Sequence, residues 1–562
     1  MNLSTTTVLY KSALENITGV VSTAPLPVDE LVTVLVFVRR PNPGISLKEY
    51  ADGIVNGAIT QTLSHSEFED QYGVLDSDFS IVSAFADQVG LVVSDVHKSA
   101  ATLKLSGTAA AFNRTFGIVL TLVTVADRTF MSYSGDVSIP VELNAVIDHI
   151  LGFDNSAVLT RDSVLTPSVG VLPDIVLTPF QPQLLKTAYN FPPGDGYGGC
   201  IGILEYGGGY NQLNLDASFS PSGLPPPTNI VDISVDGATN TPDTGASAEV
   251  VLDIVVAGFL IPKAKIAVYF APNDITTGFP DSINAAIHDK INCPSVLSIS
   301  WGLDETVWQT YSALAAMDTI LQAAVILGVT ICTSTGDYGS KPDSGSSLYR
   351  VGYPASSPYV LAVGGTGIQL NPDSTIAAEV VWNQGNQSSS GGTSTIYPIP
   401  SYQTGLTVKL YPSGNVYTFS GRAIPDVSAD ADPRSGWPYV YYGPTNQGVG
   451  STGGTSAAAP VVASAIVHLN TLLGRRLGFL NSTFYQNPQL FNDITSGNNA
   501  APLTQGYSAT VGWDACTGLG SPNVSKIYQL FNTGGTFPKL GFGFRPASGA
   551  VYPRPNAGTR ID

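Results

Sequence analysis

Hydrophobic positions in the first part of the chain follow strand alternation and helical spacing in turn. Val32–Val38 alternates and is rich in β-branched residues, which predicts a strand, and Asp76–Gly90 carries apolar residues at helical spacing. Two further strands are expected at Leu91–Val96 and Ala101–Leu105, followed by a short helix at Thr108–Phe116. This order predicts an α+β unit in which helices cover one face of a small antiparallel sheet.

From about residue 182 the pattern changes to short apolar runs, each followed by a helical stretch. The runs that we interpret as strands are Cys200–Leu204, Ile230–Val235, Ala264–Phe270, Ser295–Ser300 and Val329–Thr333. Such alternation predicts an α/β unit with a parallel sheet and crossover helices.

Two segments without periodicity divide the chain. Residues 155–179 hold Pro167, Pro173 and Pro179, which is typical of an exposed linker. The last stretch is rich in Gly and Pro, which indicates a loosely held tail. We therefore expect an N-terminal domain at 1–153, a linker at 154–180, a main domain at 181–531 and a tail at 532–562.

Composition and charge exclude several classes of protein. The chain has 43 Asp+Glu against 25 Lys+Arg, a formal net charge of -18, and this excess of acid argues against binding to nucleic acid. The longest apolar stretches, Val250–Ile261 and Ala457–Val467, are interrupted by Asp253 and Pro460 and are shorter than the ~18 residues of a membrane span. We therefore expect a globular protein with no membrane span.

The four cysteines are too sparse for a disulfide scaffold or a zinc site, and we expect most of them to be buried thiols. They are Cys200, Cys293, Cys332 and Cys516. Residues 1–20 lack the basic start and apolar core of a signal peptide.

The sharpest local motif delivers a serine to the start of an apolar helix. Gly453-Gly454-Thr455-Ser456 runs directly into Ala457–Pro460. Small residues let a substrate backbone approach, and the helix start offers N–H groups to a developing oxyanion. A serine that only caps a buried helix is the structural alternative. As a nucleophile, Ser456 needs a base.

Histidine does not fit the role of that base. His65, His97 and His149 lie in the first unit or at its end, and His288 and His468 lack the helix-opening context of a histidine base. We expect them to be surface or satisfied core residues.

Carboxyl groups fit the role better. Glu249 and Asp253 are spaced i, i+4 in an apolar helical stretch, so they share one helix face. Burial and like charge raise the pKa of at least one of such a pair, although many i, i+4 acid pairs are a solvated face. A third acid, Asp337, follows the apolar strand Val329–Thr333 in Gly336-Asp337-Tyr338-Gly339. A protonated aspartate there can donate to an oxyanion, and a simple turn aspartate is the alternative.

With these motifs in this order, the chain resembles the sedolisin family of serine-carboxyl peptidases, in its kumamolisin-like branch, over about Leu31–Pro522. The resemblance implies a subtilisin-like parallel sheet with flanking helices, preceded by a ferredoxin-like activation prodomain. It implies four catalytic residues: the nucleophile Ser456, the base Glu249, the supporting Asp253 and the oxyanion donor Asp337. The prodomain carries Val38-Arg39-Arg40-Pro41 and Phe112-Asn113-Arg114-Thr115-Phe116-Gly117 as its marks.

Further stretches carry the same resemblance. It implies that Glu205 extends the hydrogen-bond network and that Ser298, Trp301 and Gly302 belong to the substrate-binding strand. It also implies one structural Ca²⁺ site formed by Asp493, Ile494, Thr510, Gly512 and Asp514. Gly352 stands where kumamolisin-like members can carry an acid, which leaves open whether a basic side chain is preferred.

These residues predict an acid-acting serine-type endopeptidase made as a zymogen, with polypeptide substrates and its own prodomain as inhibitor. A tripeptidyl-peptidase of the same family, a silent homologue that acts as a binding protein, and a subtilisin-type hydrolase with a histidine base are the alternatives. We expect a monomer that works outside the cell or in an acidic compartment.

Overall fold

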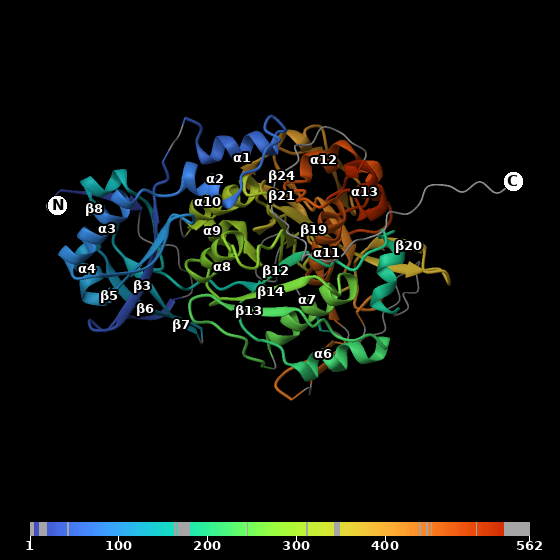
Figure 1. Ribbon diagram of the computed structural model, residues 1–562, viewed down its shortest axis with the longest axis horizontal. Helices are drawn as coiled ribbons and strands as arrows, with labels where there is room; N and C mark the ends of the chain where they lie inside the picture. The colour runs from blue at the N-terminus through green and yellow to red at the C-terminus, as the bar shows by residue number, and fades with distance from the viewer. Residues whose placement is uncertain are drawn as a thin grey trace, which may run out of the picture.

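The computed structural model describes residues 5–10, 20–41, 44–126, 128–161, 164–165, 180–243, 245–310, 313–341, 349–437, 440–445, 448–450, 452–501 and 503–532. The expected tail after residue 532 and most of the expected linker lie outside these ranges. In Figure 1 the N-terminal elements lie on one side of the molecule, and the central sheet with its helices forms the rest.

The N-terminal unit is built on a four-stranded antiparallel sheet with the order β4-β5-β3-β9. Its strands are β3 (Leu31–Val38), β4 (Val92–His97), β5 (Thr102–Thr108) and β9 (Ile147–Leu151). The helices α3 (Asp76–Val89) and α4 (Ala109–Phe116) supply Phe79, Phe85, Phe112 and Phe116 to a core with the alternating valines of β3.

The other face of this sheet is also covered. Leu35 and Phe37 alternate with those valines along β3 and join a hydrophobic cluster that contains Phe279 and Trp308 of the second unit. Because successive strand residues point to opposite faces, β3 contributes to two cores at once. The N-terminal unit is therefore packed on the second unit through the face that its own helices leave open.

Two helices extend this contact. They are α1 (Leu47–Val55) and α2 (His65–Tyr72), and both begin with a Ser-x-x-Glu capping box, Ser46 with Glu49 and Ser64 with Glu67. Figure 1 shows α1 lying across α10, which belongs to the second unit. The remaining N-terminal elements are β1 (Thr6–Tyr10), β2 (Val20–Pro25), β6 (Val119–Val125), β7 (Arg128–Ser134), β8 (Val137–Pro140) and η2 (Val141–Ala145).

The second unit contains an eight-stranded sheet with the order β13-β14-β12-β15-β17-β19-β20, in which β25 also pairs with β19. All of its pairs are parallel except β19 with β20. The strands are β12 (Cys200–Glu205), β13 (Ile230–Ser234), β14 (Lys265–Phe270), β15 (Val296–Ile299), β17 (Thr330–Ser334), β19 (Leu361–Leu370), β20 (Ile376–Val381) and β25 (Val427–Asp430).

Helices cover both faces of this sheet, as expected for a parallel sheet. The helices α7 (Ser247–Leu260) and α11 (Thr455–Leu473) share one hydrophobic cluster with the strands, and α8 (Gly278–Ile287) and α10 (Ala313–Ile326) share the other. The second apolar stretch is longer than the sequence analysis expected, because α11 does not end at Pro460 and has 19 residues in all. By length and composition α11 could cross a membrane, but 83% of its apolar stretch is buried inside the protein.

Shorter elements surround the sheet. The helices are α5 (Leu185–Ala188), α6 (Gln212–Phe219), α9 (Glu305–Thr310), α12 (Asn481–Gln486), α13 (Val524–Asn532), η3 (Pro182–Leu184), η4 (Ser220–Ser222), η5 (Ser401–Gln403) and η6 (Pro488–Leu490). The strands are β10 (Thr160–Arg161), β11 (Val164–Leu165), β16 (Trp301–Asp304), β18 (Gly352–Tyr353), β21 (Gly392–Pro398), β22 (Thr407–Tyr411), β23 (Val416–Thr418), β24 (Gly421–Ile424), β26 (Val440–Tyr442), β27 (Gly448–Gly450), β28 (Thr452–Gly453), β29 (Phe491–Asn492), β30 (Gly506–Tyr507) and β31 (Ser521–Pro522).

The four cysteines are free thiols. Cys200, Cys332 and Cys516 are buried, whereas Cys293 is exposed.

Candidate active site

Ser456 is the second residue of α11 and is fully buried. The turn that precedes it depends on glycine at two positions. Gly454 has φ +98°, a region that L side chains rarely adopt, and a Cβ on Gly453 would lie 2.3 Å from the carbonyl oxygen of Ala431. The Oγ of Ser456 lies 3.5 Å from the carbonyl oxygen of Ser300, to which it donates.

Three buried carboxyl groups lie together near this serine. Glu249 and Asp253 share one face of α7, and Glu205 ends β12; all three side chains are buried. Burial raises the pKa of Asp253 well above its ordinary value, and the charges of Glu205 and Glu249 raise it further. Burial and the charge of Glu249 likewise raise the pKa of Glu205. Such a group binds protons more readily than an exposed carboxylate does.

Ser300 joins the nucleophile to these acids. Its hydroxyl lies 2.9 Å and 3.1 Å from the two carboxyl oxygens of Asp253 and donates to them, which favours the charged form of Asp253. Its carbonyl oxygen is the acceptor for Ser456. The sequence analysis did not single out Ser300, although it directly precedes Trp301 in the stretch that we had assigned to substrate binding.

Asp337 lies three residues beyond the end of β17 and is held by the first residue of α11. Its Oδ1 accepts from the backbone N–H of Thr455 at 2.8 Å and from the Thr455 hydroxyl at 3.0 Å. The same hydroxyl accepts from the N–H of Gly336 at 3.1 Å. Thr455 therefore holds the loop that carries Asp337 against the start of α11, directly before Ser456. Its place in the Gly-Thr-Ser motif did not by itself reveal this role.

The residues predicted for substrate binding occupy different environments. The indole N–H of Trp301 donates to Glu205 at 3.0 Å, and the side chain is buried. Gly302 lies in β16, between β10 and β18, and a Cβ there would approach the carbonyl oxygen of Tyr353 to 3.1 Å. Ser298 is placed elsewhere: it lies inside β15, where its backbone is paired with Ile203 on one side and Cys332 on the other. The structure therefore does not bring the Ser298 backbone to an open edge.

Part of the predicted linker pairs with strands on both sides of the nucleophile. Thr160 and Arg161 (β10) pair antiparallel with Gly302 and Trp301, and the Thr160 hydroxyl donates to the Gly302 carbonyl at 3.0 Å. Four residues later, β11 pairs antiparallel with β28, which lies directly before Gly454. Residues 162 and 163 lie outside the described ranges. An extended chain bound by strand edges is how peptide recognition by β-augmentation works.

The histidines are engaged away from the serine. His468 Nε2 is 2.8 Å from the carbonyl oxygen of Pro192, and its ring lies against Phe191. The ring of His288 lies 5.6 Å from that of Phe68 in the N-terminal unit. These contacts do not support the alternative in which a histidine serves as base for Ser456.

The residues predicted to bind Ca²⁺ converge on one turn. Asp514 Oδ2 accepts from the N–H of Thr510 at 3.1 Å, and Asp493 Oδ2 accepts from the N–H of Gly512 at 2.9 Å. Burial raises the pKa of Asp514 to about 7. Two carboxylates that meet at one turn supply oxygen ligands of the kind that a hard cation uses. Ile494 is buried beside Asp493.

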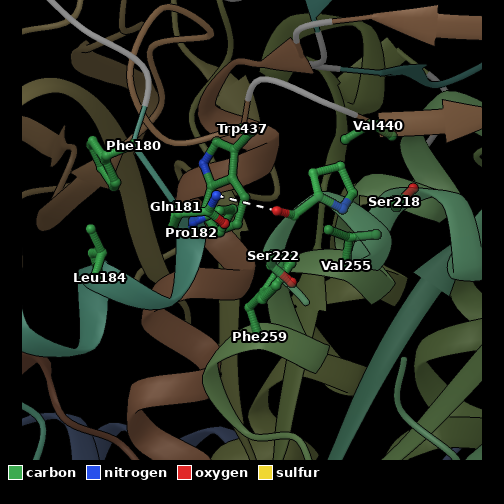
Figure 2. A pocket seen from close by; sticks show the side chains of 11 residues that line it. Phe180, Gln181, Pro182, Leu184, Ser218, Ser222, Val255, Phe259, Trp437 and Val440 are labelled. Atoms are coloured by element: carbon green, nitrogen blue, oxygen red, sulfur yellow. Dashed lines mark hydrogen bonds between the residues drawn. The ribbon is translucent and has the colours of Figure 1, made fainter. Parts of the chain in front are cut away.

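A separate apolar pocket of about 420 Å³ lies against α7. Figure 2 shows Phe180, Trp437, Val255 and Phe259 around it, with Gln181 donating to the carbonyl of Pro221 at 3.4 Å. Val255 and Phe259 follow Asp253 by two and six residues, so they lie on the opposite face of the helix. This pocket is therefore not part of the acid cluster.

Comparison with known proteins decides the family. Residues 18–156 match the pro-kumamolisin activation domain, and residues 238–475 match the subtilase family. Kumamolisin of Bacillus sp. (strain MN-32) is 39% identical over 528 residues, which cover 91% of this chain and 93% of that protein. The chain belongs to the sedolisin family of serine-carboxyl peptidases.

Other relatives agree with this assignment. Tripeptidyl-peptidase sed1 of Aspergillus fumigatus is 30% identical, with 64% of this chain and 66% of that protein covered. The structure of Pseudomonas sedolisin, a serine-carboxyl proteinase complexed with two molecules of pseudo-iodotyrostatin, matches at 26% identity with a TM-score of 0.55. That match covers 64% of this chain and 99% of the sedolisin chain. The peptidase therefore has the subtilisin-like fold of this family, preceded by an activation domain.

Proposed function

We propose that this peptidase is an acid-acting endopeptidase made as a zymogen, with Ser456 as nucleophile, Glu249 as base and Asp253 as the acid that orients Glu249. Asp337 in its protonated form and the N–H of Ser456 bind the oxyanion. The observation that carries this proposal is the pairing of linker segments with strand edges on both sides of Ser456, because a substrate chain needs the same edges.

The proposed reaction uses the serine hydroxyl as an activated nucleophile. Ser456 Oγ forms a bond to the scissile carbonyl carbon while its proton passes to Glu249. The carbonyl oxygen takes the negative charge and accepts hydrogen bonds from Asp337 and the Ser456 N–H. Glu249 then gives its proton to the leaving amine, and a water molecule repeats the sequence to clear the acyl-enzyme.

Thr455 and Ser300 have positioning roles in this proposal. Thr455 donates two hydrogen bonds to Oδ1 of Asp337, so the acidic proton belongs on Oδ2, where it can be donated. Ser300 donates to Asp253 and thereby favours the charged form of that acid. Both residues act through the groups that they hold.

Acid is required because the site uses a carboxylate base together with a protonated aspartate. Carboxyl groups have reference pKa values near ~4, so both forms are populated together only in acid. We expect an optimum at about pH 3 to 5, from the match between catalytic pKa and working pH. Secretion, or delivery to an acidic compartment, would supply this condition.

Endopeptidase activity is favoured over tripeptidyl-peptidase activity by the path of the linker. Upstream of β10, the N–H of Leu159 donates to Asn273 at 2.7 Å, and the chain continues back to β9. An extended segment longer than three residues thus fits before the nucleophile. A substrate with a blocked N-terminus separates the two activities, because an endopeptidase cleaves it and a tripeptidyl-peptidase does not.

Side-chain selectivity follows from the cleft beside Asp337. Its lining includes Gly302, Ser334, Gly336 and Gly352, and none of its described lining residues is charged. Gly352 therefore brings no carboxylate to this subsite. We expect uncharged side chains to be preferred there over lysine and arginine.

Maturation is proposed to occur between Arg161 and Val164. Arg161 is the last residue of β10 and Val164 is the first residue of β11, and these two strands flank Ser456. Shifting the purified chain from pH 7 to pH 4 should produce a new N-terminus at residue 162, 163 or 164, together with cleavage of a denatured protein. Ser456→Ala should show neither effect. Ser464→Ala, which removes another buried hydroxyl of α11, is the matched control and should behave as the unmodified chain. If the unmodified chain stays intact and inert at pH 4, the silent-homologue alternative replaces this proposal.

One structural Ca²⁺ ion is proposed at the turn between Asp493 and Asp514, with carbonyl oxygens of Ile494, Thr510 and Gly512. The raised pKa of Asp514 supports a bound cation, which would stabilise its charge. Chelation should lower the unfolding temperature of Ser456→Ala at pH 7. An added Asp493→Asn substitution should remove the response to Ca²⁺, and an unchanged response would contradict the site.

A further inference from the structure

The activation domain and the catalytic domain enclose a polar cavity of about 640 Å³ between them. Titratable groups from both domains line it, including His97, Lys104, Asp281, His288 and Lys290. The active-site acids do not line this cavity. Its titratable groups therefore lie outside the candidate active site.

His288 occupies an unusual position at this boundary. It is the C-cap of α8 in the catalytic domain, and its ring lies 5.6 Å from Phe68 and 6.5 Å from His65, both on α2 of the activation domain. Its two ring nitrogens are buried and have no hydrogen-bond partner among the described residues. A charged imidazole has two N–H donors, so this position is costly for the protonated ring.

The charges around His288 also disfavour a proton on its ring. Burial lowers the pKa of His288 well below its ordinary value, and Arg40, His65, Lys290 and His97 lower it further. Arg40 comes from the activation domain, where its guanidinium lies 5.2 Å from the centre of the Phe68 ring. A proton on His288 would therefore face cations from both domains.

The acids nearby are engaged by other groups. Glu69 accepts from Lys290 at 2.8 Å and from Ser99 at 3.0 Å, and Asp289 accepts from the hydroxyl of Tyr269 at 2.8 Å. Lys104 pairs with Asp95 and Asp281 at 3.0 Å and 2.9 Å across the same cavity, and also with Asp236. Carboxylates are thus present at the domain boundary, but they accept hydrogen bonds from groups other than His288.

We propose that His288 is a proton sensor that loosens the activation domain when the zymogen enters acid. The protonated ring is accommodated only when α2 moves away and water reaches its nitrogens. The inference rests on the proposed function, since loosening this contact is what an acid-activated zymogen requires. It adds a step that the catalytic acids do not provide.

The direction of this effect follows from linkage. A histidine whose pKa is lowered in the closed state binds fewer protons there than in the open state. Its contribution to closure is present above the ordinary value of 6.5 and is lost as the pH falls below that value. Each pH unit below 6.5 raises the opening constant up to about tenfold, until His288 titrates in the closed state.

Two neighbours also change how the opening constant depends on pH. Burial lowers the pKa of His65 in the same way, so it adds to the opening in acid. Burial and Asp236 raise the pKa of Asp281 to about 8, and a carboxyl with a raised pKa favours the closed state as the pH falls. That contribution grows from about pH 8 down to the ordinary value of 3.8, so it opposes the opening over the range in which His288 promotes it, and the effect of His288 is therefore read as the difference between chains with and without this histidine.

The test uses the full chain with Ser456→Ala, which cannot cleave itself, so opening is measured without peptidase activity. Hydrogen exchange of α2 and α8, corrected for intrinsic rates, gives the opening constant from pH 7 to pH 4. With His288→Gln added, the rise in the opening constant between pH 6.5 and pH 4.5 should shrink by up to about 100-fold. His288→Phe should behave similarly, which guards against a failure of one variant to fold.

His468→Gln is the matched control, because it removes a histidine of lowered pKa that lies away from the activation domain. It should leave the opening profile unchanged. An identical profile with and without His288 would overturn the proposal. Failure of the proposed function would appear separately, as an unmodified chain that opens in acid but cleaves nothing.

Discussion

This protein has two clusters of carboxyl groups, one in the active site and one at the domain boundary, and they have different neighbours. In the active site, Glu205 and Glu249 act on Asp253 as like charges, and burial raises the pKa of Asp253 together with them. At the domain boundary, Asp95, Asp236 and Asp281 surround the amine of Lys104 instead. In the first group the acids raise one another's pKa, whereas in the second a lysine lies among the acids, although burial and Asp236 still raise the pKa of Asp281. A shared cation therefore reduces, without abolishing, the rise in pKa that burial and clustering cause.

The largest effect is expected from Glu249→Gln, which removes the proposed base from the active-site group. kcat/KM at pH 4 should fall about 10³- to 10⁴-fold, since an amide cannot accept the serine proton. Cleavage of an N-terminally blocked peptide measures this. Glu379→Gln is the control: Glu379 is a carboxyl group of the same domain that accepts from Thr366 at 2.7 Å and from Ser521 at 2.6 Å. Equal losses in both variants would count against a role for Glu249 in proton transfer.

The next effect concerns stability and its dependence on pH. The pKa of Glu205 is raised in the folded state by burial first and by Glu249 second, so the folded state binds more protons than the unfolded chain. Stability should therefore fall as the pH rises above the ordinary value of 4.5. Glu205→Gln, which keeps an acceptor for Trp301, should recover part of the loss between pH 4.5 and pH 7.

Urea unfolding of the Ser456→Ala chain at several pH values measures this difference. The exposed Glu30→Gln is its control and should leave the slope unchanged. The comparison between the two acid groups would fail if Glu205→Gln kept the full pH slope.

A third effect tests the group that the lysine neutralises. Burial opposes the charge of Lys104, but Asp281 and Asp236 raise its pKa above the ordinary value. With Lys104→Met, the acids of this group lose the cation that they share, and the opening constant at pH 7 should rise about tenfold. Acid should partly restore closure, because the acids then take up protons. Hydrogen exchange of β5 reports this opening. Lys263→Met, which breaks an exposed pair with Asp195, should change little.

The smallest effect is expected from Ser300→Ala. This change removes a donor that lowers the pKa of Asp253, so that pKa should rise further and the acid limb of the pH profile should move to higher pH. kcat/KM at the optimum should fall about threefold to tenfold, the usual contribution of one such hydrogen bond. The matched control is Ser298→Ala, a buried hydroxyl two residues earlier in the same stretch. A profile that did not move would show that Ser300 only packs against the acids.

The sequence predicted the central sheet well because its strands are buried on both faces. The strands around Ile203, Val268 and Ile331 were found as apolar runs, since a parallel sheet covered by helices needs no polar alternation. The assignment of Ser456 and Glu249 as catalytic residues rested on motifs and order, and their roles remain predictions.

Other features were invisible in the sequence because they depend on distant partners. The strands β10 and β11 have two residues each, and two residues show no periodicity. Lys104 meets Asp236 across 132 positions of the chain, and His288 meets Phe68 across a domain boundary. A lone charged or aromatic residue carries no local sign of such a partner. For the same reason His288 was expected to be a surface or satisfied core residue, whereas its ring nitrogens are buried without a described partner.

The linker strands that flank Ser456 would also set the reaction order of the proposed activation. The segment proposed to be cut is tethered to the site that would cut it and already pairs with strands on both sides of it. Such a reaction proceeds at the effective concentration of a preformed complex and does not wait for two molecules to meet. The half-time of the first cleavage should then be independent of dilution, so that a single zymogen molecule entering acid can mature alone.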